Sequence, residues 1–194
     1  MPLGNLAATL IFKPHAGPAD AAKRSFMAAN ALYQALRAVA PDADLALKWP
    51  NDVLLNGGKV AGILLESASS GPLVDWLSIG IGVNLVGHPA VVQDSGSGQP
   101  VNLLEQTGIS IPPEDFLTHL AQAFVAQEDL LSREGFARIR QDWLAHAARL
   151  GETIIARTQT AEYVGIFETV DEDGNLSLLT AEGVMTIPAA DIYF

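Results

Sequence analysis

The chain has 194 residues, 49% of them hydrophobic and 17% charged, which is enough to bury one core and a small second domain. Its 22 acidic and 11 basic residues give a formal net charge of −11, which argues against a nucleic-acid partner because phosphate binding needs clustered Lys and Arg. The absence of cysteine excludes disulfides and thiolate zinc sites, and the histidines show no metal spacing, so we expect neither zinc nor haem.

The sequence shows neither an apolar run long enough for a membrane span nor a signal-peptide pattern at its start. We therefore expect no membrane association and a cytoplasmic location. The elements of the first part are predicted as a strand over 5–12, a helix over 19–40 that Pro41 ends, and β-rich segments over 45–49, 53–55, 60–65 and 73–86. Residues 56–58 form a hairpin turn, and 87–100 are expected to be a loop.

Two helices are predicted next, over 113–131 and 133–150, with Gly151 closing the second. Short alternating strands then follow over 153–157, 163–170, 176–180 and 184–187. We expect an α+β fold in which residues 1–150 form the main domain and residues 151–194 form a small β-barrel.

The densest cluster of chemically useful side chains is KWPND at 48–52, which a hairpin turn separates from KVAGI at 59–63. Pro50 interrupts a regular strand, so Asn51 and Asp52 are expected at a strand end, with Lys59 returned towards them. No basic residue lies between Lys59 and Arg133, so Lys48 and Lys59 would neutralise the phosphates of any bound nucleotide. An exposed ion pair between Lys48 and Asp52 beside an ordinary hairpin also fits this pattern.

A second candidate is the GIGVN segment at 80–84. Strand alternation places Gly80, Gly82 and Asn84 on one face and apolar side chains on the other. A face of nearly bare backbone is typical of close approach by a ligand, and Gly62 repeats the device on a neighbouring strand. Tight packing of the glycines against the protein itself is the alternative.

These motifs, in this order and with GNL at 4–6 before them, resemble the signature of the biotin protein ligases. The resemblance implies a mixed β-sheet flanked by helices, plus the C-terminal barrel. It implies that Lys59, Asp52 and Lys48 are catalytic, and that Asp52 can also bind Mg²⁺. It further implies a biotin site and a nucleotide site, lined respectively by Lys59, Gly62, Ile63, Leu64, Gly80 and Gly82, and by Lys48, Asn51 and Asn84.

The implied reaction has two steps. The biotin carboxylate attacks the α-phosphate of ATP, with Mg²⁺ on the departing pyrophosphate, and a lysine of a biotin carboxyl carrier protein or domain of acetyl-CoA carboxylase then attacks biotinyl-AMP. A homodimer is a further expected assembly.

Members of the family carry a Gly/Arg-rich loop before the strand that begins with GNL, and we expect this chain to lack that loop and the strand and helix before it. Two alternatives therefore stay open: a non-catalytic homologue that binds carrier domains or dimerises, and a lipoate-type ligase.

Overall fold

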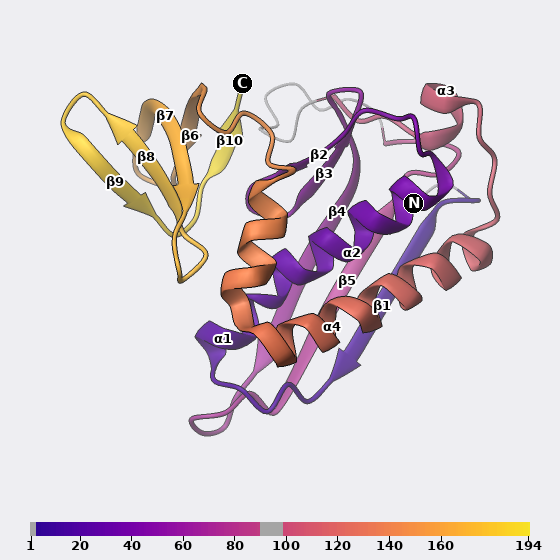
Figure 1. Cartoon of the computed structure of the whole chain (residues 1–194), viewed down its shortest axis with the longest axis horizontal. Helices are drawn as coiled ribbons and strands as arrows, with labels where there is room; N and C mark the ends of the chain where they lie inside the picture. The colour runs from indigo at the N-terminus through magenta and orange to yellow at the C-terminus, as the bar shows by residue number, and fades with distance from the viewer. Residues whose placement is uncertain (1–2, 90–98) are drawn as a thin grey trace.

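A computed structural model of the chain describes residues 3–89 and 99–194. Its elements, labelled in Figure 1, are β1 (Leu6–Phe12), α1 (Pro18–Ala22), α2 (Arg24–Val39), β2 (Leu45–Lys48), β3 (Asp52–Leu55), β4 (Gly58–Ala68), β5 (Trp76–Val83), α3 (Leu103–Thr107), α4 (Pro113–Leu144), β6 (Thr153–Arg157), β7 (Glu162–Val170), β8 (Leu176–Thr180), β9 (Gly183–Ile187) and β10 (Asp191–Tyr193). The expected α+β class is confirmed. The predicted loop over 87–100 lies largely outside the described residues.

The strands form two five-stranded sheets, in the orders β1-β5-β4-β3-β2 and β10-β6-β7-β8-β9. All pairings between these named strands are antiparallel, which corrects the mixed sheet that we expected. Parallel contacts among the described residues are two isolated bridges, Leu47 with Ala147 and Lys59 with Pro100. The C-terminal sheet, where we expected a small β-barrel, has β9 and β10 at the two ends of its strand order.

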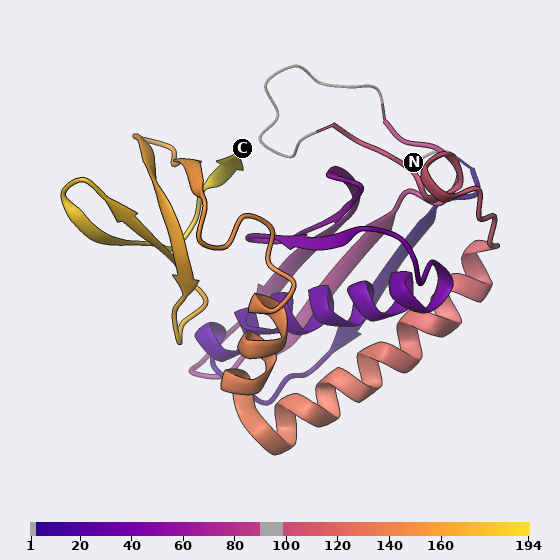
Figure 2. The ribbon, with the colours of Figure 1, turned by 45° about the horizontal axis from the view of Figure 1, so that its top comes forward.

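Helices α2 and α4 cover the same face of the first sheet (Figures 1 and 2). Met27, Leu32 and Leu36 of α2 are completely buried there, and Ile79 and Ile81 of β5 are 0% and 1% exposed. Each such side chain contributes roughly 1.5–3 kcal/mol by leaving water. The opposite face of the sheet carries no covering helix in the described part of the chain and is open to solvent.

The helices differ in detail from the sequence prediction. The helix predicted over 19–40 is divided at Lys23 into α1 and α2, although its apolar spacing continues through the break. The two helices predicted over 113–131 and 133–150 are confirmed as two helical segments that share the label α4, and they are separated at Gly135, whose φ of 74° and ψ of −177° are not helical. α4 ends at Leu144 because the following backbone pairs with β2, where the amide of Leu47 donates to the carbonyl of His146 at 2.8 Å.

The C-terminal sheet is attached to the main domain at the end of β2 and at α4. The indole Nε1 of Trp49 donates to the carbonyl of Gly174 at 3.1 Å, and the Arg140 guanidinium donates to the carbonyl of Val170 at 3.2 Å. The short elements α3 and β10 were not predicted. No helix in the described part of the chain is long and apolar enough to cross a membrane.

Candidate active site

A row of paired residues crosses the open face of the first sheet. Antiparallel register aligns Ala7 of β1 with Gly82 of β5, Gly82 with Gly62 of β4, Gly62 with Asp52 of β3, and Asp52 with Lys48 of β2. Paired residues in adjacent strands share a face of the sheet. Along this face the row starts with small residues at positions 7, 82 and 62, and it ends with the acidic Asp52 and the basic Lys48. The predicted grouping of these glycines on one strand face is confirmed by the burial pattern of β5.

The small residues of this row and the next one form the floor of a hollow of about 460 Å³. In the next row Thr9 pairs with Gly80, and Gly80 pairs with Leu64. The volume lies within the range of about 300–1,000 Å³ that is usual for small-molecule sites. The lining residues are Ala7, Ala8, Thr9, Asn51, Asp52, Lys59, Gly62, Ile63, Leu64, Gly80, Ile81 and Gly82.

An ion pair stands at one side of this floor. Nζ of Lys59 lies 2.6 Å from Oδ1 of Asp52, and the side chains are 29% and 8% exposed. A Cβ added to Gly62 would lie 3.2 Å from Cε of Lys59 and 3.5 Å from Oδ1 of Asp52. The missing side chain of Gly62 therefore leaves the space in which the two charged groups meet.

Burial dominates the electrostatics of the acid and of the second lysine. It raises the pKa of Asp52, although the nearby Lys59 and Lys48 partly offset this effect. It lowers the pKa of Lys48, against the attraction of Asp52 and Asp191. Lys48 and Asp52 are only 4% and 7% exposed, so the alternative of an ordinary exposed ion pair between them is wrong.

The KWPND turn is fixed to β4 by Asn51. The peptide bond between Trp49 and Pro50 is cis. The Asn51 side-chain amide donates to the carbonyl of Ile63 at 2.7 Å, and the amide of Ile63 donates to the carbonyl of Asn51 at 2.9 Å. The side chain of Ile63 is 3% exposed and belongs to the core, so this residue presents main chain to the hollow, whereas Leu64 presents an exposed side chain.

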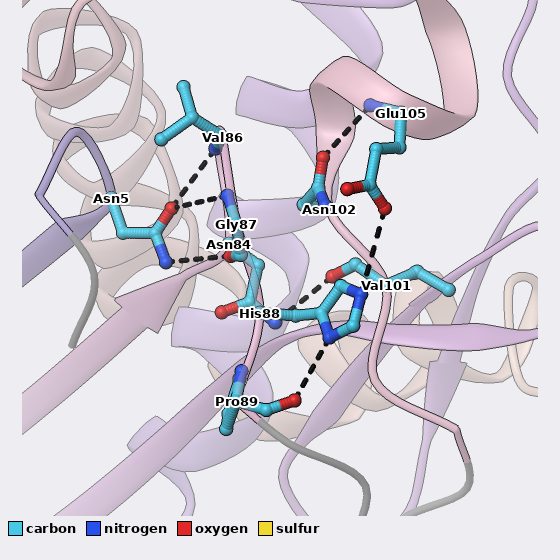
Figure 3. Close-up of polar contacts among 9 residues, drawn as sticks. All are labelled: Asn5, Asn84, Val86, Gly87, His88, Pro89, Val101, Asn102 and Glu105. Carbon is cyan, nitrogen blue, oxygen red and sulfur yellow. Dashed lines mark hydrogen bonds and ion pairs between the residues drawn. The ribbon is translucent and has the colours of Figure 1, made fainter.

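Asn84 lies just beyond the end of β5 and outside the set of lining residues. Its side-chain amide donates to the carbonyl of Val101 at 3.0 Å (Figure 3). Its main-chain carbonyl accepts from the amide of Leu103 at 2.9 Å. Asn102 then begins α3 by accepting from the amide of Glu105 at 2.8 Å. The structure thus shows Asn84 joining β5 to the segment that leads into α3.

Asn5 makes a similar junction between the start of β1 and the segment that follows β5. Its Oδ1 accepts from the amides of Val86 and Gly87, and its Nδ2 donates to the carbonyl of Gly87 (Figure 3). Sequence reasoning noted Asn5 only as part of a motif. These bonds fix the start of β1, which supplies the first wall of the hollow.

Most of the predicted site residues are brought together. Eight of them line one hollow, namely Asn51, Asp52, Lys59, Gly62, Ile63, Leu64, Gly80 and Gly82. Lys48 stands at the end of the row, and Asn84 lies beyond the end of β5. Sequence reasoning missed the contribution of β1, where Ala7, Ala8 and Thr9 carry no chemical signature and are identified only by their pairing with β5.

The architecture is a hollow on the uncovered face of an antiparallel sheet, with a C-terminal sheet attached at the edge of that sheet. The profile of the Biotin/lipoate A/B protein ligase family matches residues 3–145, and that of the Biotin protein ligase C terminal domain matches residues 150–194. The chain therefore belongs to the biotin/lipoate A/B protein ligase family.

Individual relatives support this assignment. The chain is similar to the Biotin--[acetyl-CoA-carboxylase] ligase of Paracoccus denitrificans, with 55% identity over 100% of this chain and 82% of the relative. It is 30% identical to the Bifunctional ligase/repressor BirA of Bacillus subtilis over 95% of this chain, and it spans 56% of that relative. The biotin protein ligase of Aquifex aeolicus in complex with biotin and ATP shares the fold, with a TM-score of 0.80, 22% identity, and coverage of 97% of this chain and 77% of that one.

Proposed function

We propose that the protein is a biotin protein ligase, which activates biotin with ATP to biotinyl-AMP and transfers the biotinyl group to a lysine of the biotin carboxyl carrier protein or domain of acetyl-CoA carboxylase. One observation supports this proposal above the others. The Lys59–Asp52 ion pair stands beside a floor of small residues, in a chain that is 55% identical over its whole length to a ligase of that name.

The floor suits a flat bicyclic ligand such as the rings of biotin. Gly80 and Gly82 offer no side chains, and the exposed side chain of Leu64 provides an apolar wall. We assign Gly62, Ile63, Leu64, Gly80 and Gly82 to the biotin site, with Ile63 acting through its main chain. The carboxylate of biotin would then reach towards Lys59.

In the first step an oxygen of the biotin carboxylate attacks the α-phosphorus of ATP, and the bond to the β-phosphate oxygen breaks to release pyrophosphate. The ammonium of Lys59 stabilises the negative charge that develops on the phosphoryl oxygens. We assign Lys48, Asn51 and Asn84 to the nucleotide. Lys48 neutralises phosphate charge, whereas Asn51 and Asn84 shape the site through the hydrogen bonds that their side-chain amides donate to backbone carbonyls.

In the second step the acceptor amine attacks the acyl carbon of biotinyl-AMP, and AMP leaves as the amide bond forms. The proton that the amine loses needs an acceptor, and the carboxylate of Asp52 is the acidic group that lines the hollow among the described residues. Its raised pKa makes it a better base than an ordinary aspartate.

Magnesium fits this site as a partner of the nucleotide. Mg²⁺ commonly binds one or two protein carboxylates together with substrate phosphates. Asp52 supplies a buried carboxylate, and within residues 3–89 and 99–194 no group of three or more candidate protein ligands gathers. When bound, the ion would neutralise charge on the departing pyrophosphate.

The direct test is transfer of labelled biotin to an isolated carrier domain in the presence of ATP and Mg²⁺. The matched control is the same domain with its target lysine changed to arginine. We expect ATP-dependent labelling of the parent domain alone. Binding of the carrier without labelling would indicate a non-catalytic carrier-binding homologue, and labelling by lipoate in preference to biotin would indicate a lipoate-type ligase.

A further inference from the structure

The last residue of the C-terminal sheet region meets the KWPND motif of the first sheet. β10 pairs with β6 and leads directly into Phe194. The ring centroid of Phe194 lies 4.8 Å from Nζ of Lys48 and 5.3 Å from the guanidinium carbon of Arg149. Both distances are within the range of cation–π attraction, so two cations contact one ring.

The neighbouring motif residue is held by the same sheet. Trp49 donates its indole N–H to the carbonyl of Gly174, in the turn between β7 and β8. Two consecutive residues of the motif therefore contact two separate parts of the C-terminal sheet. Lys48 is also paired in register with Asp52. A displacement of the Lys48 side chain would therefore disturb the end of the row of paired residues that crosses the open face of the first sheet.

The surroundings of Lys48 do not hold it by charge alone. It is 4% exposed and faces the acids Asp52 and Asp191 and the second cation Lys59. Asp52 is already paired with Lys59 at 2.6 Å. An aromatic face attracts an ammonium electrostatically, so the ring of Phe194 can contribute to fixing the position of this group.

We propose that Phe194 is a positioning residue for the ligase reaction, whose ring holds the Lys48 ammonium where it meets the nucleotide phosphates. This inference rests on the proposed function, because it uses the assignment of Lys48 to the nucleotide. The C-terminal sheet thereby contributes to nucleotide affinity through Lys48, without itself contacting the nucleotide.

The test compares F194L, which keeps apolar cover but removes the aromatic face, with F194Y, which keeps the face. V184A is the matched control, because Val184 is an exposed apolar residue on β9 of the same sheet. We expect F194L to raise the KM for ATP about two- to fivefold, as the loss of a cation–π contact with a half-exposed ring predicts. The KM for biotin and the thermal midpoint should stay at the parental values, and F194Y and V184A should behave as the parent.

A second measurement does not depend on turnover. In protein labelled with ¹³C-lysine, the ε-CH₂ resonance of Lys48, assigned by its loss in K48M, should carry a ring-current shift in the parent and in F194Y but not in F194L. Titration of this resonance with ATP should show weaker binding in F194L.

Equal ATP affinity in parent and F194L would overturn the positioning role, whatever the activity of the parent. A parent that binds ATP through Lys48, weakened in F194L, but releases no pyrophosphate would support the positioning role while the proposed function fails. An equal rise in the KM values for ATP and biotin, together with a lower thermal midpoint, would indicate a structural role and also overturn the proposal.

Discussion

Lys59 and Asp52 form an ion pair of 2.6 Å in the space that Gly62 leaves empty. A methyl group on Gly62 would lie 3.2 Å from Cε of Lys59 and 3.4 Å from its Nζ, which is tighter than ordinary contact. The atoms that it would meet belong to the end of a flexible lysine, so the chain can fold while the ammonium moves. The geometry of the two charged groups therefore depends on the absence of a side chain at residue 62.

Gly62→Ala is expected to fold normally and to reduce the rate of adenylate formation about tenfold, since small displacements of a catalytic group are costly. The rate of biotin-dependent pyrophosphate release and the thermal midpoint check this. A double-mutant cycle with Lys59→Met provides the control. If Gly62 acts through Lys59, the double variant should be no slower than Lys59→Met alone, and fully additive effects would contradict this explanation.

Two residues on β5, Gly80 inside the hollow and Ser78 outside it, are expected to differ in how a substitution affects biotin binding. A Cβ on Gly80 meets only Leu64, at 3.7 Å and beyond, so Gly80→Val should fold, and a β-branched residue suits a strand. Its side chain would occupy the ligand space and weaken biotin binding by about 1–3 kcal/mol, the usual cost of overpacking. Calorimetric titration with biotin measures this effect.

Ser78→Val is the matched control for Gly80→Val, because residue 78 lies on the same face of the same strand but outside the hollow. It should bind biotin as the parent does. Gly82→Val should resemble Gly80→Val, since Gly82 also lines the hollow. Parental affinity in both glycine variants would show that this face does not bind biotin, and loss of folding would show that it packs against protein.

The buried carboxylate of Asp52 is expected to lower the free energy of unfolding. Burial raises its pKa, so the folded chain binds this proton more tightly than the unfolded chain does. The free energy of unfolding therefore falls as pH rises through the raised pKa, and the cost is fully present above it. Asp52→Asn should remove this cost, giving a higher thermal midpoint than the parent above the raised pKa and a smaller difference below it.

The same substitution should slow transfer to the acceptor lysine, because the amide cannot accept a proton. In the parent, the transfer rate should fall as pH drops through the raised pKa of Asp52, and Asp52→Asn should lack that acid limb. Stopped-flow transfer from preformed biotinyl-AMP measures this step alone. If Asp52→Asn were less stable than the parent at every pH, the attraction between Asp52 and Lys59 would outweigh the cost of burying the carboxylate.

Local signals in the sequence predicted a large part of this site. The turn at Asn56 and Gly57, both with positive φ, brings Lys59 back beside Asp52 as expected, and strand alternation places Gly80 and Gly82 on one face. These features follow from turn chemistry and from a period of two, which depend on neighbouring residues.

The features that were missed depend on contacts between distant segments. Ala7 and Thr9 line the hollow only because β1 pairs with β5, and their residue types give no hint of this role. α4 ends before Leu150 because the backbone after it pairs with Leu47. The contact of Phe194 with Lys48 joins two segments that are far apart in the sequence, and neither local propensity nor a short motif could indicate it.

The measurement that tests the central claim most directly is single-turnover formation of biotinyl-AMP by the parent and by Lys59→Met. The matched control is Lys13→Met, which removes an exposed positive charge outside the hollow. If the ammonium of Lys59 stabilises the developing phosphoryl charge, Lys59→Met should form the adenylate about 100- to 1,000-fold more slowly, while Lys13→Met keeps the parental rate. Formation of biotinyl-AMP by Lys59→Met at the parental rate would contradict the account.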